Sequence, residues 1–311
     1  MTRNILLIVN PNAGQINKVF KWFNAIIGWN KINKSNTIQD QINSVINFFE
    51  DHGCKIDYAI TKQKGDATRF AKKASSEAVD TIIAMGGDGT INEVVNGMIH
   101  SKSKLGVIPY GTANVFGLSF NLPTRLKNAC NVILNGQSKS IDLGSINGHY
   151  FVCMAGVGFD AYIIKKADKA LKKTIGALSY VVLAMLEYYR YKFHPIVIKV
   201  DDDPTPKKGY FMIICNTKYY GGKFVISDKT DPADGLLDIC LIKDQGLFTA
   251  IKCSVQLALG KIKKGPMVEK FQCKKVHIRA FGRHRMHCDA EYIGHTPAKV
   301  IIHPNALRII H

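Results

Sequence analysis

The sequence predicts an α/β fold in two parts: an N-terminal doubly wound parallel α/β domain and a C-terminal β-rich domain of antiparallel, sandwich-like strands. In the first part, short apolar runs alternate with segments of helical periodicity, the pattern of a parallel sheet covered by helices. Near Lys139 this alternation stops, and Asn147-Gly148 signals a type I′ hairpin between antiparallel strands. The expected domains are 1–138 and 139–303, with the tail 304–311 left open as a completion of the first.

The N-terminal domain is expected to hold four parallel strands. Thr81–Met85 is a short, bounded apolar run, as in a strand buried on both faces. Between 38 and 49 apolar residues recur at helical spacing, and Gly53 ends that helix. The segment 20–35 lacks periodicity and is interpreted as an insertion or a partly helical loop. The other expected elements are strands at 5–9, 55–60 and 105–109, and helices ending near Ala74 and Asn135.

The C-terminal domain is expected to consist mainly of strands. A long helical region from about Ala161 to Lys192 interrupts them, and we interpret it as a buried helix in preference to a membrane-docking face. A second helix is expected over 247–259. The β-like segments are 195–200, 210–215, 236–242, 271–280, 284–289 and 299–303.

The charge of the chain limits its partners. The 311 residues include 42 Lys and Arg against 24 Asp and Glu, a net charge of +18. This surplus favours nucleic acid, an anionic membrane or phosphorylated ligands. Because no recognised nucleic-acid module is present, we expect no nucleic acid and prefer peripheral contact with an anionic membrane surface. A homodimer stays open.

Cysteine usage and hydropathy favour a cytoplasmic protein. The eight cysteines are scattered without Cys-x-x-Cys pairs and mostly lie in apolar segments, as in a reduced protein. The strand at 5–9 is too short for the core of a signal peptide, and no uncharged apolar run reaches about 18 residues. We therefore expect neither export nor a membrane span.

The turn from Gly86 to Thr90 carries the strongest functional signal. It reads Gly-Gly-Asp-Gly-Thr, between the strand at 81–85 and a helix that begins near Thr90. Its glycines let an anionic ligand approach the backbone, and the N terminus of the helix offers N–H groups to a triphosphate. Asp88 beside phosphates suggests an intervening Mg²⁺. An ordinary glycine-rich turn is the alternative.

A second phosphate-loop candidate follows the first strand. The residues from Asn10 to Gly14 read Asn-Pro-Asn-Ala-Gly, which alone is equally consistent with an ordinary Asn-Pro turn. Because the carboxyl ends of parallel strands lie at one edge of a sheet, this loop and the turn at Gly86 imply one shared cleft.

Two acidic clusters lie in the C-terminal part. Asp231 and Asp234 belong to an Asp-Pro-Ala-Asp-Gly turn, whose simplest interpretation is a loop between strands. Asp289 and Glu291, two apart on an extended chain, are expected to project to the same face. There they could supply a general base and a magnesium contact. A solvated strand face is the alternative.

The chain resembles the bacterial diacylglycerol kinase-like lipid kinases, which are related to sphingosine kinases and NAD kinases. The central turn is common to all of these families, but the full set of motifs, in family order over nearly the whole chain, is similar to the first. Beyond the two loops described above, the matching motifs are Gly65-Asp66-Ala67, Gly111-Thr112-x-Asn114, Gly156-x-Gly158-Phe159-Asp160, Asp234-Gly235-x-Leu237-Asp238 and Asp289-x-Glu291.

That resemblance implies a kinase that transfers the γ-phosphoryl of ATP to a hydroxyl of diacylglycerol or a similar lipid. Glu291, helped by Asp289, would activate the hydroxyl, and Asp88 would serve the phosphate and Mg²⁺ side. The implied ligands of a further Mg²⁺ are Asp231, Asp234 and the backbone of Leu236. The implied ATP contacts are Asn10, Pro11, Asn12, Ala13, Gly14, Thr61, Gly87, Asp88, Gly89, Thr90, Ile91, Asn92, Glu93 and Thr112.

Three departures from the family pattern bear on function. Val115 stands where the family often has Asp, Ala290 replaces the glycine of Asp-Gly-Glu, and the segment 20–35 looks longer than usual. Val115 and the basic surface keep open a catalytically degenerate scaffold that binds nucleotide and membrane. An NAD kinase is the enzymatic alternative because it shares the central turn, although the two last motifs favour a lipid kinase.

Overall fold

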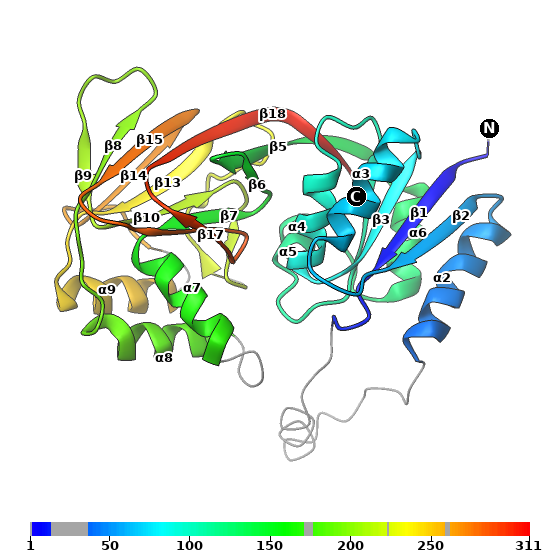
Figure 1. Cartoon of the computed structure of the whole chain (residues 1–311), viewed down its shortest axis with the longest axis horizontal. Helices are drawn as coiled ribbons and strands as arrows, with labels where there is room; N and C mark the ends of the chain where they lie inside the picture. Colours follow the sequence, from blue (N-terminus) through cyan, green and yellow to red (C-terminus); the bar gives the residue numbers. More distant parts are fainter. Residues whose placement is uncertain (1, 14–36, 171–176, 223, 259–261) are drawn as a thin grey trace, which may run out of the picture. The chain divides into compact units, whose positions relative to one another are not determined.

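The computed structural model describes residues 2–13, 37–170, 177–222, 224–258 and 262–311. The chain forms two compact units (Figure 1). Unit 1 consists of Met1–Lys139 with Leu307–His311, and unit 2 consists of Ser140–Ala306. The tail that the sequence left undecided therefore returns to the N-terminal unit. The segment 20–35 lies outside the described residues.

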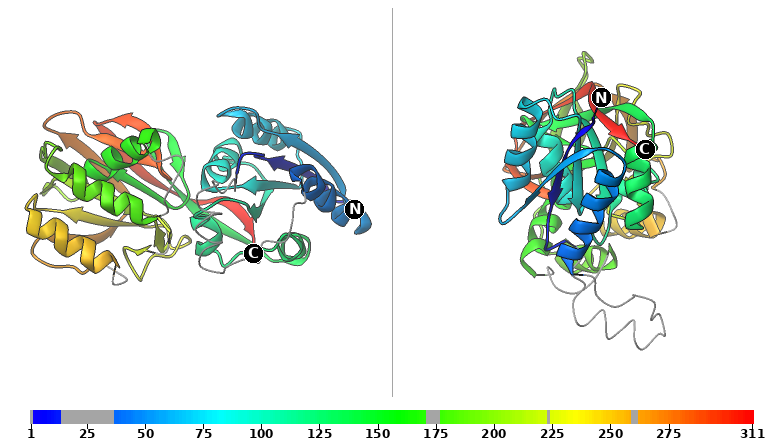
Figure 2. Two further views of the ribbon diagram at one scale, coloured as in Figure 1. Left: turned by 90° about the horizontal axis from the view of Figure 1, so that it is seen from below. Right: turned by 90° about the vertical axis from the view of Figure 1, so that its right-hand side faces the viewer.

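Unit 1 is a parallel sheet with helices on both faces, which confirms the doubly wound prediction (Figure 2). Each neighbouring pair of its strands is parallel. Every residue of the central strand β3 is buried, because helices cover both faces of the sheet. Arg308 and Ile309, near the end of β18 (Ala298–Ile310), extend the sheet beside β4. The strand order is β2 (Lys55–Ile60), β1 (Asn4–Val9), β3 (Thr81–Gly86) and β4 (Lys104–Pro109).

The helices of unit 1 bury one apolar stripe each. α2 (Ile38–Asp51) begins at a capping box, in which Thr37 and Asp40 bond each other's backbone N–H, and it packs with α6 (Leu126–Asn135) against one face of the sheet. α3 (Asp66–Ser76) and α4 (Asp88–Gly97) pack together beside β1 and β3. α4 and α3 thereby start at the edge where the parallel strands end.

Unit 2 contains two large antiparallel sheets and a small two-stranded one, β11 (Tyr219–Tyr220) with β12 (Phe224–Val225), which confirms the β-rich prediction. Side chains between the two large sheets form one apolar core. One sheet has the order β14 (Val268–Cys273), β13 (Leu237–Ile242), β10 (Phe211–Cys215), β7 (Met154–Val157), β16 (Arg285–Cys288) and β17 (Glu291–His295). The other comprises the first part of β18 with β15 (Lys275–Ala280), β8 (Ile196–Val200), β9 (Lys207–Gly209), β5 (Ser138–Ile146) and β6 (His149–Phe151).

Two predicted elements of unit 2 are corrected. The expected strand at 271–280 is two strands in different sheets, β14 and β15. Cys273 and Val276 are both buried in the core between the sheets, and residues three apart on one straight strand would face opposite sides. The helical region that begins near Ala161 is also two elements, α7 (Phe159–Ala170) and α8 (Ala177–Tyr188), and α9 (Leu247–Ala258) follows later.

Candidate functional site

The predicted phosphate loops of unit 1 lie together at the carboxyl edge of its sheet. Asn10 follows β1, and its backbone N–H donates to the carbonyl oxygen of Met85 at 3.0 Å. The Asn10 side chain donates from Nδ2 to Oγ1 of Thr90 at 2.9 Å. Its Oδ1 accepts from the backbone N–H of Asn12 at 3.0 Å. One asparagine therefore fixes the loop after β1 against the first turn of α4.

The glycines of the central turn and of the loop after β4 also leave room for neighbouring atoms of the protein. A Cβ on Gly86 would lie 2.6 Å from Cβ of Thr90, and a Cβ on Gly111 would lie 2.5 Å from Cα of Gly87. Neither contact is permitted, so the turns after β3 and β4 pass each other backbone to backbone. From the sequence, Gly86 and Gly87 were expected to serve ligand approach alone.

The N terminus of α4 is the candidate anion site in unit 1. Gly87 is its N-cap residue, and no side chain caps the helix there. The N–H groups of the first turn, together with the positive end of the helix dipole, favour a phosphate at this place. At the neighbouring start of α3, by contrast, the Glu93 carboxylate accepts from the backbone N–H groups of Gly65 at 3.0 Å and Ala67 at 3.2 Å. Glu93 thus caps α3.

Asp88 has a structural partner. Its Oδ1 accepts from the backbone N–H of Phe116 at 3.0 Å, in the first turn of the short helix α5 (Val115–Ser119). Burial raises the pKa of the Asp88 carboxyl above its ordinary value, and the backbone N–H groups of Phe116 and Val115 oppose that rise. Val115, which replaces a carboxylate of the family pattern, is buried in α5. One oxygen of Asp88 is therefore engaged by α5.

The remaining predicted ATP contacts differ in accessibility. Thr61 is buried directly after β2, whereas Thr112 is exposed in the loop after β4. Ile91 is buried, and its N–H bonds the carbonyl oxygen of Gly87 at 3.0 Å, so it supports α4 from inside. Asn92 is also buried in α4. Pro11 and Ala13 are half-buried, Gly89 lies in the first turn of α4, and Gly14 lies outside the described residues.

In unit 2, the predicted pair of acids does not lie on an extended strand. Asp289 and Ala290 have φ values of 44° and 63°, so they form a left-handed turn between β16 and β17. The expectation that Asp289 and Glu291 project to one face of a strand is therefore wrong, since it assumed extended backbone throughout. Glu291 is the first residue of β17 and is half-buried.

The Asp289 carboxylate is used to hold the turn. Its Oδ2 accepts from the backbone N–H of Val152 at 2.8 Å, and its Oδ1 accepts from those of Cys153 and Met154, each at 2.9 Å. Three backbone donors satisfy a buried carboxylate that would otherwise be costly to desolvate. Asp289 is therefore a positioning residue in this structure, and Glu291 is the acid next to it that remains a candidate base.

A second network supports the same turn, and it was not foreseen. Nε2 of the fully buried His287 lies 2.7 Å from Oδ2 of Asp160, and Tyr220 donates from its hydroxyl to Oδ1 of Asp160. The backbone N–H of Ala290 donates to Nδ1 of His287 at 3.3 Å. Nδ1 is thus the unprotonated nitrogen, and Nε2–H donates to Asp160.

The sequence did contain a signal for this network. A Cβ on Gly156 would collide with both the Asp160 carboxylate and the His287 ring, so this position must be glycine. The Gly-x-Gly-Phe-Asp motif therefore makes room for the pair and supplies its acid.

In the loop predicted to bind a metal ion, the two aspartates accept hydrogen bonds from backbone N–H groups of the same loop. Oδ1 of Asp231 accepts from the backbone N–H of Ala233 at 3.0 Å, and Oδ1 of Asp234 accepts from that of Leu236 at 2.9 Å. Burial raises the pKa of Asp234, and the neighbouring carboxylates raise it further, Asp238 ahead of Asp231 and Asp142. Among the described residues no three or more carboxylate, His or Cys side chains converge as a metal site.

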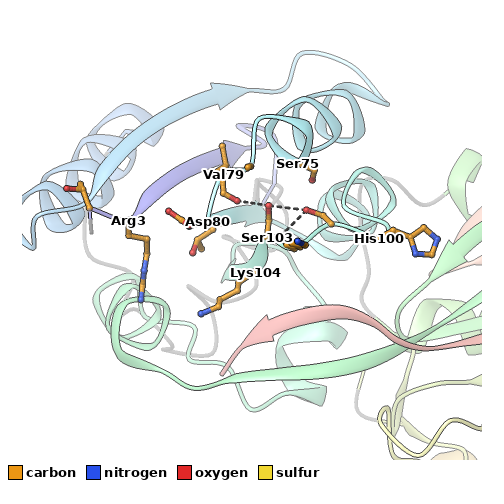
Figure 3. A pocket seen from close by; sticks show the side chains of 12 residues that line it. Arg3, Ser75, Val79, Asp80, His100, Ser103 and Lys104 are labelled. Atoms are coloured by element: carbon orange, nitrogen blue, oxygen red, sulfur yellow. Dashed lines mark hydrogen bonds between the residues drawn. The ribbon is translucent and has the colours of Figure 1, made fainter.

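A hollow of about 490 Å³ in unit 1 lies away from the phosphate loops of the same unit (Figure 3). Asp80, Thr81 and Lys104 line it, and these residues lie at the amino ends of β3 and β4. The phosphate loops lie at the opposite, carboxyl ends of the same strands. The hollow is therefore not part of the candidate site.

Comparison with known proteins follows the division into two units. Residues 4–146 match the family described as the diacylglycerol kinase catalytic domain. Residues 153–311 match the family described as the YegS C-terminal NAD kinase beta sandwich-like domain. Among the described residues, no helix is both long and apolar enough to cross a bilayer.

Individual relatives agree over most of the chain. It is 30% identical to a diacylglycerol kinase of Bacillus subtilis (strain 168) over 274 residues, which are 86% of this chain and 88% of that protein. It is 31% identical to a diacylglycerol kinase of Staphylococcus aureus (strain Newman) over 245 residues, 78% of this chain and 77% of that one. A crystal structure of a putative diacylglycerol kinase from Bacillus anthracis str. Sterne shares the fold, with a TM-score of 0.76 at 24% identity, over 99% of this chain and 97% of that one.

The match to a kinase catalytic domain and the relatives at 30% identity over most of the chain show that this protein is a kinase, that is, a phosphotransferase. The chain belongs to the diacylglycerol kinase family.

Proposed function

We propose that this kinase uses Mg²⁺-bound ATP to phosphorylate a hydroxyl of diacylglycerol or a similar lipid, at an anionic membrane surface. The observation that carries the proposal is the start of α4, where the Gly-Gly-Asp-Gly-Thr turn leaves a helix N terminus without a side-chain cap. The names of the relatives support diacylglycerol as the acceptor class.

Unit 1 supplies the nucleotide side. The first N–H groups of α4 would bind phosphate oxygens of ATP, and Asn10 holds the adjoining loop in place through Thr90. The fold holds these groups in place, because the two turns pack closely at Gly87 and Gly111, where an added Cβ would lie 2.5 Å from backbone. Such preorganised donors stabilise charge that develops during phosphoryl transfer.

Unit 2 supplies the base. Glu291 would accept the proton of the lipid hydroxyl as that oxygen attacks the γ-phosphorus. Asp289 and His287 fix the turn from which Glu291 extends, so their part is to orient Glu291 without contacting the lipid. Holding the base in one orientation is a large part of the rate enhancement available to such a reaction.

The residues implied to bind a further Mg²⁺ fit that ion in part. Asp231, Asp234 and the Leu236 carbonyl are oxygen donors, the type Mg²⁺ prefers, and Mg²⁺ commonly retains several waters where protein ligands are few. The carboxylates that raise the pKa of Asp234 repel one another, and a cation would relieve that repulsion. When bound, Mg²⁺ on ATP would neutralise phosphate charge. The chain's own residues would bind the nucleotide and orient the lipid hydroxyl.

The proposal is tested by transfer of labelled γ-phosphate from Mg-ATP to diacylglycerol, a sphingoid base, an isoprenoid alcohol and NAD. We expect a labelled lipid and no labelled NAD. Glu291→Gln should lower kcat by about 10²–10⁴-fold, the usual contribution of a general base, while ATP binding is unchanged. The same variant retaining full activity would remove Glu291 from the mechanism.

Two other outcomes would replace the proposal. Labelled NAD without labelled lipid would make the protein an NAD kinase. ATP binding without any labelled acceptor would favour a scaffold that has lost catalysis, which is the reading that Val115 suggests.

A further inference from the structure

Large exposed apolar side chains gather on two helices of unit 2. Seven of the nine such side chains among the described residues lie on α8, on the residue after it, and on α9. The other two are Tyr58, on β2, and Phe281, directly after β15. We define the α8–α9 face as Met185, Leu186, Tyr189, Leu247, Phe248, Ile251 and Val255.

The spacing places each set on one side of its helix. Phe248, Ile251 and Val255 are three and four residues apart, and Leu186 stands in the same relation to Tyr189. These are prominent side chains: Phe248 is 72% exposed, and Tyr189 is 77% exposed. The two helices run side by side in unit 2 (Figures 1 and 2). The hydroxyl of Tyr188, at the end of α8, donates at 2.5 Å to the carbonyl oxygen of Gln245, two residues before α9.

Other groups attach these helices to unit 2. Glu187 of α8 is buried and accepts from Tyr162 of α7 at 2.7 Å, and it also pairs with Lys166. Thr249 of α9 is buried and donates to Asp244. The outward apolar side chains therefore contribute little to holding the fold, and their presence on the surface needs another reason.

Charge distinguishes the kind of partner. The acid on this part of α8, Glu187, is buried and paired with Lys166 and Arg190. Arg190, Lys192 and Lys252 are exposed at or beside the face. An apolar helix surface with an aromatic side chain and a cationic rim fits the headgroup region of an anionic bilayer.

We infer that the α8–α9 face docks this protein on a bilayer that contains anionic lipid. This inference rests on the proposed function, because a water-soluble acceptor would give the enzyme no reason to adsorb. The apolar side chains enter the interface, while the cations contact lipid phosphates. Binding then depends on the apolar area of the face and on the anionic charge of the lipid. A substitution can remove the first and a change of lipid the second.

The test is sedimentation of the full-length protein with vesicles of phosphatidylcholine, with or without phosphatidylglycerol. Phe248→Ser should lower the partition coefficient for anionic vesicles about tenfold, equivalent to about 1.4 kcal/mol. Tyr58→Ser is the control, since Tyr58 is 47% exposed on β2 of unit 1 and belongs to neither helix. It should bind as the parent protein does, and omission of phosphatidylglycerol should weaken binding of all three.

Equal vesicle binding by the two serine variants would overturn the inference. So would light scattering showing that Phe248→Ser turns a dimer into a monomer with vesicle binding unaltered, because the face would then belong to a second copy. Vesicle binding is measured without ATP, so it can succeed where phosphorylation fails. If the parent protein phosphorylates diacylglycerol, Phe248→Ser should lose activity on vesicle-borne substrate and keep it on a short-chain, dispersed one.

Discussion

A Cβ on Gly111 would lie 2.5 Å from Cα of Gly87, so the loop after β4 meets the central turn of unit 1 at a position that cannot carry a side chain. Asn114 closes the loop after β4, because its Oδ1 accepts from the N–H of Gly111 at 2.8 Å and its Nδ2 donates to the Gly111 carbonyl oxygen at 2.9 Å. The position of the α4 N terminus thus depends on a contact between two glycines from different motifs.

Gly111→Ala should damage both stability and nucleotide binding. The added methyl group must displace the turn at Gly87, and overpacking of this kind costs about 1–3 kcal/mol. Urea unfolding measures that loss, and calorimetry with ATP measures the fall in affinity. Gly265→Ala is the control, because a Cβ there meets nothing within 4 Å. Unchanged ATP affinity in Gly111→Ala would show that the two turns do not fix the nucleotide site.

Ala290→Gly should stabilise the protein. Ala290 has a φ of 63°, a left-handed conformation that costs an L-residue about 1–2 kcal/mol. Glycine removes that strain but gains freedom in the unfolded chain, so we expect a net gain of about 0.5–1 kcal/mol in urea unfolding. Ala78→Gly, at a φ of 55° in unit 1, should behave alike. A loss of stability at Ala290 would mean that its methyl group makes a contact worth more than the strain.

His287→Phe should lower kcat more than it changes the KM for ATP. The phenyl ring fills the same volume but can neither accept from Ala290 nor donate to Asp160, so the turn before Glu291 loses its support. Misorientation of a base costs up to about 10²-fold in rate. Tyr220→Phe, which keeps the His287–Ala290 bond, is the milder control. Equal losses in kcat and in ATP affinity would point to general damage.

His284→Phe should make the free energy of unfolding less dependent on pH below about pH 6.5. The ring of His284 is buried, neither nitrogen has a hydrogen-bond partner, and burial lowers its pKa from 6.5 to about 4. Between these values the unfolded chain binds a proton that the folded protein does not, so stability falls as the pH drops from 6.5 toward 4. The difference is about 3 kcal/mol at most.

Unfolding in urea at pH 7 and pH 5 measures that slope. The phenylalanine variant should lose less stability than the parent protein over this interval. His277→Gln, at an exposed position of β15, should follow the parent protein. Parallel curves for all three proteins would show that His284 is protonated equally in both states.

Most of the fold could be predicted from the sequence, because a strand buried on both faces leaves a short, continuous run of apolar residues. The run Thr81–Met85, the spacing of Ile42, Val45 and Phe49, and the Asn147-Gly148 turn correspond to β3, α2 and the β5–β6 hairpin. The break at Lys274 was missed, although Lys274 and Lys275 interrupt the alternation of apolar residues there, and pairing with different neighbours separates β14 from β15.

The sequence predicted which motifs form the candidate site, but not which hydrogen bonds their side chains make. Adjacent parallel strands made the meeting of the loops at Asn10 and Gly86 predictable. The partners of Asp88 and Asp289 were not, because each carboxylate bonds backbone N–H groups, which every residue has, at positions remote in sequence. His287 belongs to none of the motifs singled out in the sequence, and its partner, Asp160, lies 127 positions away in the chain.

The pairing of β18 with β4 has a consequence for synthesis of the chain. Unit 1 is interrupted in sequence by the whole of unit 2, and Arg308 and Ile309 reach β4 only after unit 2 has left the ribosome. Until then β4 has an open edge, and such edges invite pairing with other chains. The unit that we propose to bind ATP would thus begin to form first and be completed last, so a chain shortened before Leu307 should aggregate even though all its glycine-rich loops are present.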